Sequence, residues 1–91
     1  MEATPIAPEQ CRAGRALLAW SQDDLSTKAK VAKKTLQLFE LGKRKPYKQT
    51  LQSLRRALEA AGIEFIAEDE SSAGGGPGVR LAKPLRRKRG K

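Results

Sequence analysis

The 91-residue sequence contains no histidine and only one cysteine, Cys11. Histidine is the commonest general base near neutral pH and the commonest metal ligand. A single cysteine cannot form a disulfide within the chain, and zinc sites built from cysteine and histidine need several such ligands. Because the acids, serines and lysines form no catalytic constellation either, we expect neither an enzyme nor a protein with a metal or another cofactor.

Long apolar stretches are also missing. No run approaches the roughly 20 residues that a helix needs to span a bilayer. Residues 1–10 hold acids and prolines and lack the apolar core of a signal peptide. These absences predict a cytoplasmic protein with no membrane association. Aromatic residues make up only 4% of the sequence, and its length suits one small helical domain rather than a large sandwich or barrel.

Positive charge is in excess: 19 lysines and arginines against 10 acids give a formal net charge of +9. A small protein this basic usually binds a polyanion, either nucleic acid or an anionic membrane surface. Since the sequence argues against a membrane, nucleic acid is the partner we expect.

Apolar periodicity and capping residues predict four helices. The first covers 9–20, with Cys11, Gly14 and Leu18 on one apolar line and Ala13, Leu17 and Trp20 on another. Ser21 with Asp24 forms a capping-box pattern that starts a second helix over 22–29. A third helix covers 32–41 and a fourth 48–61, each followed by a glycine suited to a left-handed cap, Gly42 and Gly62.

The segment after the fourth helix changes character. "IEFI" at 63–66 alternates and is β-branched, which predicts a short strand, and "VRL" at 79–81 predicts a second strand that pairs with it. We therefore divide the chain into a flexible lead-in (1–7), a helix-turn-helix domain (8–62), a strand–glycine loop–strand segment suited to dimerisation (63–82), and a disordered basic tail (83–91). The fold class is all-α, with four or five helices and at most a short C-terminal β-ribbon.

A capped short helix, a tight turn and a short basic helix are the outline of a helix-turn-helix module. On a helical wheel, Thr35, Leu36 and Phe39 fall on one side of the third helix, and the opposite side carries Lys33, Lys34, Gln37, Leu38 and Leu41. Lysine can donate to guanine or phosphate, and glutamine can pair with adenine. Two lysines at a helix start cost about 0.3–1 kcal/mol each in the free protein, a cost that bound DNA would offset.

Residues 8–61 resemble the lambda-repressor-like, xenobiotic-response-element-type family of bacterial and phage regulators. The resemblance rests on "WSQDDLSTKAKVAKKTLQLFELGKRKP". The matching positions are the Ser-Gln-x-x-Leu opening of the second helix, the turn valine, the apolar pair and Glu-x-Gly of the third helix, and the basic loop that ends in proline: Ser21, Gln22, Leu25, Val31, Leu36, Phe39, Glu40, Gly42 and Lys43 to Pro46.

The resemblance implies a role for each matching position. Gln22 would anchor a DNA phosphate from the start of the second helix, and Glu40 would bond within the domain. Bases or nearby phosphates would be contacted from the third helix by Lys33, Lys34, Thr35, Gln37 and Leu38. The following loop would grip the DNA backbone through Lys43, Arg44 and Lys45.

Three features depart from the family pattern, and one of them is that Leu38 and Leu41 are apolar on the predicted DNA face. Lys30 stands where glycine is common, so a positive φ there would carry mild strain. Ala32 stands at the cap of the third helix where serine or threonine is usual, which costs about 1 kcal/mol.

Several side chains have a structural and a functional interpretation. We expect Trp20 and Cys11 in the core, Leu41 packed against the fourth helix, and Arg55 and Arg56 in ion pairs with Glu59. For Tyr47, phosphate binding and packing stay equally open, as do an arm along the DNA and a solvated end for the basic tail.

These patterns predict a sequence-specific, double-stranded-DNA-binding transcriptional regulator, a repressor acting as a homodimer on an inverted repeat. One alternative is a protein-interaction module with the same fold, such as an antitoxin, co-activator or anti-activator, which would have a protein partner. Another is a non-specific nucleic-acid binder driven by its tail.

Overall fold

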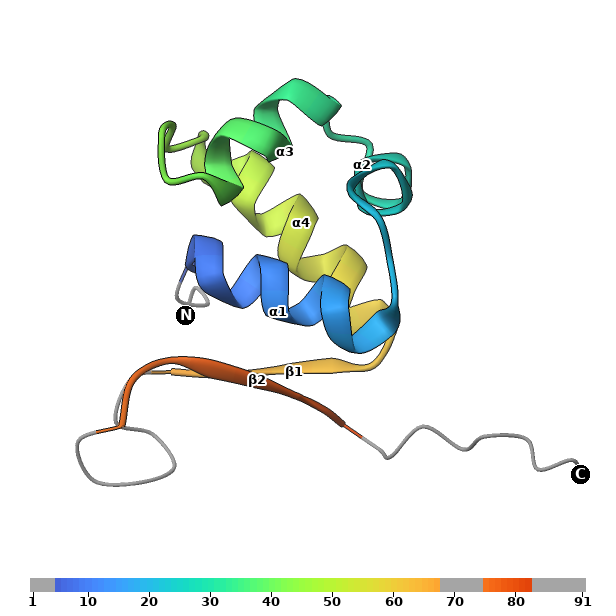
Figure 1. The fold of residues 1–91 in the computed structure, drawn as a ribbon, viewed down its shortest axis with the longest axis vertical. Coiled ribbons are helices and arrows are strands. Elements are labelled where there is room, and N and C mark those ends of the chain that lie inside the picture. Colours follow the sequence, from blue (N-terminus) through green and yellow to red (C-terminus); the bar gives the residue numbers. More distant parts are fainter. Residues whose placement is uncertain (1–4, 68–74, 83–91) are drawn as a thin grey trace, which may run out of the picture.

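A computed structural model describes residues 5–67 and 75–82 of the chain. Within them, four helices precede two short strands (Figure 1): α1 (Pro8–Leu18), α2 (Gln22–Ala29), α3 (Lys33–Glu40), α4 (Lys48–Ala60), β1 (Ile63–Ile66) and β2 (Gly78–Leu81). The four predicted helices and both predicted strands are present. The chain is therefore mainly α-helical with a small sheet.

α1 ends two residues earlier than expected. Ala19 adopts a left-handed conformation with φ 58°, and the Trp20 N–H donates to the Arg15 carbonyl, which closes the helix. Trp20 is half-buried against the edge of the core, with the Lys28 ammonium 5.7 Å from its ring centroid.

The second predicted apolar line of the first helix was wrong for two of its three residues, since only Trp20 packs against the core. Ala13 and Leu17 are exposed, whereas Cys11 and Gly14 are buried and Leu18 packs against the core. A Cβ added at Gly14 would lie 3.4 Å from Leu58 Cδ2, an ordinary van der Waals distance, so this face of α1 packs directly on α4. Only a narrow strip of such a helix can face its neighbours.

The caps of α2 and α3 follow the sequence signals. The Asp24 N–H donates to Ser21 Oγ, and the Ser21 N–H donates back to the Asp24 carboxylate, so the predicted capping box is confirmed. Lys30 ends α2 with φ 58°, the strained conformation expected of a residue standing where glycine is common. Ala32 precedes α3 and gives it no side-chain cap.

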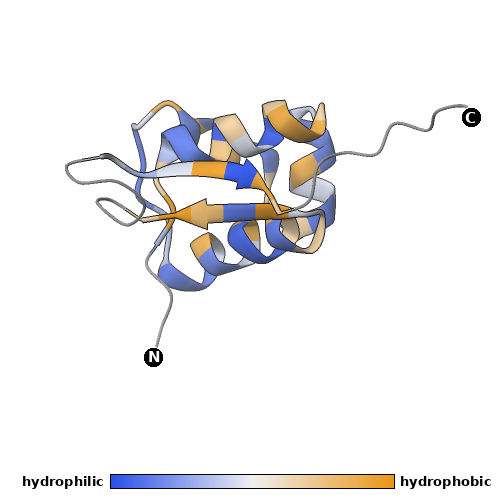
Figure 2. Cartoon of the chain, turned by 90° about the horizontal axis from the view of Figure 1, so that it is seen from below, coloured by the Kyte–Doolittle hydropathy of each residue, from blue (hydrophilic) through white to orange (hydrophobic). Residues whose placement is uncertain are grey.

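The sheet lies against α1 and α4 on the side away from α3 (Figure 1). β1 and β2 are antiparallel with Ile63 opposite Leu81, and each strand has one charged residue among mainly hydrophobic ones (Figure 2). Gln10 of α1 fastens this ribbon, because its side-chain amide donates to the carbonyls of Ile66 and Gly78. Glu64 and Arg80 pair across the strands at 2.9 Å.

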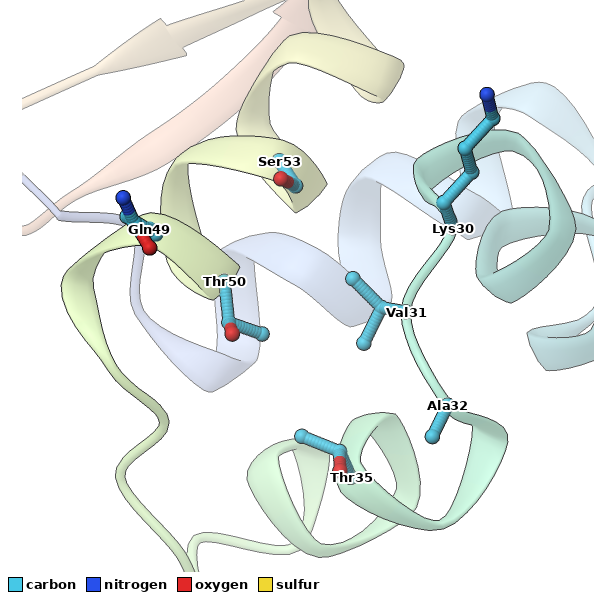
Figure 3. Close-up of a pocket in the computed structure, with 7 residues that line it drawn as sticks. All are labelled: Lys30, Val31, Ala32, Thr35, Gln49, Thr50 and Ser53. Atoms are coloured by element: carbon cyan, nitrogen blue, oxygen red, sulfur yellow. The ribbon is translucent and has the colours of Figure 1, made fainter.

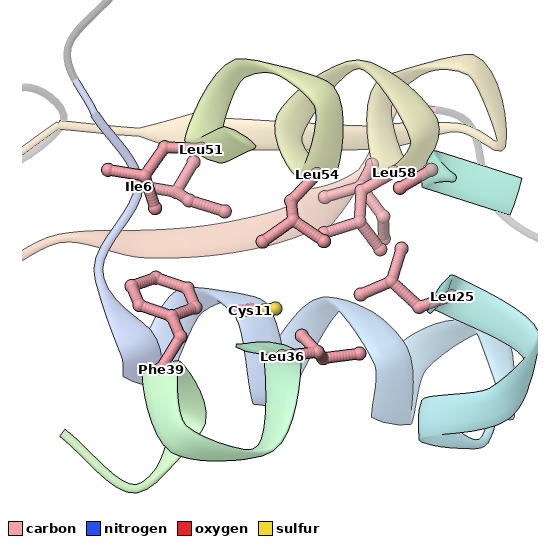
Figure 4. Close-up of a cluster of buried hydrophobic side chains, with 10 residues drawn as sticks. Ile6, Cys11, Leu25, Leu36, Phe39, Leu51, Leu54 and Leu58 are labelled. Atoms are coloured by element: carbon pink, nitrogen blue, oxygen red, sulfur yellow. The ribbon is translucent and has the colours of Figure 1, made fainter. Parts of the chain in front are cut away.

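The core collects side chains from all four helices and from β1 (Figure 4). Cys11 is fully buried there, as predicted. Ile6 is buried as well, although the sequence placed it in a flexible lead-in; Pro8 starts α1 and leaves Ile6 directed at the helices. The buried hydrophobic residues are Ile6, Cys11, Leu25, Ala29, Leu36, Phe39, Leu51, Leu54, Leu58 and Ile63.

Among the described segments, the longest helix is α4, and none is both long and apolar enough to cross a bilayer. The predicted basic tail at 83–91 and most of the predicted glycine loop lie outside the described residues.

Candidate nucleic-acid interface

α3 presents two different faces. Leu36, Phe39 and Glu40 are buried, while Lys33 and Lys34 in the first turn are exposed. At about 100° per residue, Lys34 and Leu38 lie opposite the buried trio. Gln37 and Leu38 are half-exposed, one turn beyond the lysines. The predicted division of α3 into a core side and an outer cationic side is therefore present.

Glu40 fixes the C-terminal end of α3. Only 3% of its surface is exposed, and its carboxylate accepts from Arg15 Nε at 2.8 Å and Nη2 at 2.7 Å, from Gln22 Nε2 at 2.9 Å and from Cys11 Sγ at 3.1 Å. The Arg12 guanidinium donates to the Glu40 backbone carbonyl. One carboxylate thus links α1, α2 and α3, which accords with the structural role expected of Glu40.

These contacts set the charge states at the junction. Burial alone would raise the pKa of Glu40, but hydrogen bonds from Arg15, Gln22 and Cys11 outweigh it and hold that pKa below its usual value. Burial, reinforced by the adjacent Glu40 carboxylate, raises the pKa of the Cys11 thiol far above its usual range. Cys11 is therefore a protonated donor and a poor nucleophile.

An exposed ion pair joins the start of α3 to α2. Lys33 Nζ lies 3.0 Å from Asp23 Oδ1, and the two side chains are 47% and 70% exposed. Lys34 is exposed beside them. Four residues of the two helix starts, Asp23, Asp24, Lys33 and Lys34, carry formal charges that cancel.

The loop after α3 is cationic and tied to that helix. Lys43, Arg44 and Lys45 are all exposed. Gly42 takes φ 77° as predicted, its N–H donates to the Phe39 carbonyl, and the Lys43 N–H donates to the Leu38 carbonyl. These two hydrogen bonds form a Schellman motif, which attaches the start of the loop to the end of α3.

Leu41 does not pack against α4 as expected. It is 68% exposed, and Tyr47 at the other end of the loop is 84% exposed. Leu41 is the residue that follows the last helical residue of α3, and the chain leaves the helical path directly after it, at Gly42 with φ 77°. Of the two interpretations of Tyr47, its exposure argues against packing.

Two residues of the predicted DNA-binding set stand apart from the rest. Gln22 is half-buried, and its amide N–H donates to Glu40. Thr35 lines a polar cleft of about 340 Å³ between the turn at Lys30 to Ala32 and α4, and it faces the α4 side chains rather than the outer lysine face (Figure 3). This leaves Lys33, Lys34, Gln37 and Leu38 on the outer face of α3, and Lys43, Arg44 and Lys45 exposed in the loop after it.

Three side chains around this surface went unassigned in the sequence. They are Asp23 in α2 and Arg12 and Arg15 in α1. Their partners are 10, 28 and 25 residues away along the chain. The one signal in the sequence was Glu40, an acid near the apolar side of the third helix. A buried acid is rare unless a cation lies nearby.

No protein-family model matches this chain. No curated protein matches it significantly either. Any statement about its function therefore depends on the chemistry of the surface. An exposed helix start with two lysines, amide and apolar side chains one turn on, and a loop of three cations together offer donors for phosphates and for base edges.

Proposed function

We propose that this chain is a sequence-specific double-stranded-DNA-binding transcriptional regulator with a lambda-repressor-like helix-turn-helix fold. One observation carries the proposal: α3 exposes Lys33 and Lys34 at its start while Leu36, Phe39 and Glu40 hold it from behind. A fixed helix with an exposed N-terminal turn is what major-groove recognition requires. The formal net charge of +9 supplies attraction to DNA.

The surface divides the work of binding between α3 and the loop after it. In the proposed complex α3 enters the major groove start first, so Lys34 and Gln37 meet base edges and Leu38 meets a thymine methyl group. Lys43, Arg44 and Lys45 contact phosphates, which position the helix without reading sequence. Gln22 keeps one amide hydrogen for a phosphate, because an amide has two and Glu40 accepts the other.

The proposal extends to a homodimer that represses by occupying an inverted repeat. The resemblance to regulators of this family supports it, and two recognition helices would then be about 34 Å apart, one turn of DNA. The β1–β2 ribbon and α4 are the surfaces through which two copies would associate. A two-stranded ribbon is marginal alone, so an added strand would stabilise it.

The decisive experiment is selection of bound duplexes from a random oligonucleotide pool, followed by sequencing. We expect enrichment of one short motif present twice in inverted orientation with a spacing near one helical turn. Enrichment of a single half-site would support sequence-specific binding but contradict the proposed dimer. A pool that stays random, while binding remains measurable and falls steeply with salt, would show that the chain binds DNA without selecting sequence.

A protein-interaction module is the second candidate, and it has its own observation. Leu41 and Tyr47 are large, highly exposed side chains at the two ends of the cationic loop. The combination suits an acidic protein partner with apolar anchors. In that case a Leu41→Ser, Tyr47→Ser double variant would lose a partner retained by the wild type, and the random-pool selection would yield no motif.

A further inference from the structure

The starts of α2 and α3 meet at an ion pair. Asp23 lies in the first turn of α2, and its Oδ1 is 3.0 Å from Nζ of Lys33, the first residue of α3. Asp24 is engaged within α2, where its carboxylate accepts from the Ser21 N–H. The acid nearest the exposed lysines is thus Asp23, and it stands beside the proposed DNA surface.

Folding alone gives little reason for this pair. Its side chains are 70% and 47% exposed, so water and salt screen the attraction strongly. Asp23 already suits the positive end of α2 without Lys33. The pair does not cap α3 either, and Ala32 at its start has no side-chain oxygen to do so. The ion pair has a larger effect on the charge of the proposed DNA surface.

Charge near the DNA surface is unevenly distributed. Residues 43–45 contribute three cations and no acid, whereas the two helix starts contribute two lysines and two aspartates. A phosphate that approaches Lys33 must also approach the Asp23 carboxylate, and Lys33 must leave that carboxylate in order to donate. Binding through Lys33 is therefore favourable only where DNA provides enough new contacts to offset both losses.

Resting on the proposed function, we infer that Asp23 is a specificity-determining residue. It restrains Lys33 and repels phosphates at the start of α3. A cognate duplex offsets this repulsion because Lys34 and Gln37 gain base contacts at the same time. A random duplex offers phosphates without those contacts, so Asp23 weakens random binding more than cognate binding.

The test is Asp23→Asn, which keeps the shape of the side chain and removes its charge. Binding is measured to the duplex obtained by random-pool selection and to a random duplex of equal length, across a salt series. We expect about two- to fivefold tighter binding to the random duplex, the size of a screened surface pair. We also expect a salt slope steeper by about one ion and a smaller gain on the selected duplex. Most of the gain should disappear when Lys33→Met is added.

The matched control is Glu9→Gln. It changes the net charge by the same amount at an exposed acid in the first turn of α1, a helix that belongs to neither the proposed DNA surface nor the proposed dimer surfaces. An Asp23→Asn gain no larger than that of this control, or an equal gain on both duplexes, would overturn the inference. Wild-type protein that binds neither duplex at low salt would overturn the proposed function itself.

Discussion

The two ends of α3 are held in opposite ways. At its C-terminal end, Glu40 is 3% exposed and accepts hydrogen bonds from Arg15, Gln22 and Cys11. At its N-terminal end, Ala32 provides no side-chain cap, and Lys33 pairs with Asp23 at the surface. One end is therefore fixed by buried, charge-assisted hydrogen bonds, and the other by an interaction that solvent screens.

This difference separates stability from binding. A helix that must give its cations to a ligand cannot also bury them, because a buried charge needs a permanent partner. α3 is eight residues long. Its buried charge partners lie at the C-terminal end, at Glu40, and the N-terminal end with its lysines is exposed. Substitutions at the Glu40 end should change folding, and substitutions at the Lys33 end should change DNA binding.

The largest expected effect is that of Glu40→Ala. The change removes the acceptor of three side-chain donors and leaves Arg15 without its partner, so we expect a loss of about 3–5 kcal/mol in the free energy of unfolding. Urea denaturation followed by circular dichroism measures it. Glu59→Ala, which removes an exposed partner of Arg55, should cost below about 0.5 kcal/mol. Similar losses for the two variants would mean that the Glu40 end is no better held than the surface.

The lowered pKa of Glu40 makes the stability of the fold depend on pH. Because hydrogen bonds lower the pKa of folded Glu40 below its ordinary value of 4.5, the carboxylate stabilises the fold fully above that pH. The contribution is lost as the pH falls through the lowered pKa. Thermal melting between about pH 6 and pH 2 should therefore show a stability difference between wild type and Glu40→Gln that narrows on acidification. A difference that stays constant below pH 4.5 would contradict it.

At the other end, DNA binding should separate α3 from the loop. Lys34→Ala or Gln37→Ala should change base preference, by about 1–3 kcal/mol for a residue that makes a bidentate contact. Lys43→Ala or Arg44→Ala should weaken all sequences alike and flatten the salt slope by about one ion each. Competition binding with single-base variants of the selected duplex measures both. Equal losses on every sequence for all four variants would leave α3 with no part in base recognition.

The smallest effect is a gain. Ala32→Ser supplies the oxygen that the start of α3 lacks, and we expect about 1 kcal/mol of added stability. Ala13→Ser, at an exposed position inside α1, is the control and should lose about 0.5 kcal/mol, because serine is the poorer helix former. If Ala32→Ser adds nothing, the exposed end of α3 is already held by contacts other than a cap.

Local signals in the sequence determined most of the secondary structure. The Ser21–Asp24 capping box, Gly42 and Gly62 set helix ends by interactions within a few residues, and the alternation in 63–66 specified a strand. The outward lysines of α3 follow from its period in the same way. Each of these features depends on neighbours along the chain, which a sequence displays directly.

Only the tertiary structure decided which of these faces would meet. Ile6 is buried and Leu41 exposed because of how α1, α3 and α4 pack, and Ala13 and Leu17 remain exposed because α1 has only one strip to bury. Likewise, the pairing of Asp23 with Lys33 and of Arg15 with Glu40 joins residues on different helices. Spacing along a sequence fixes directions within one helix, but the distance between two helices is set by the side chains packed between them.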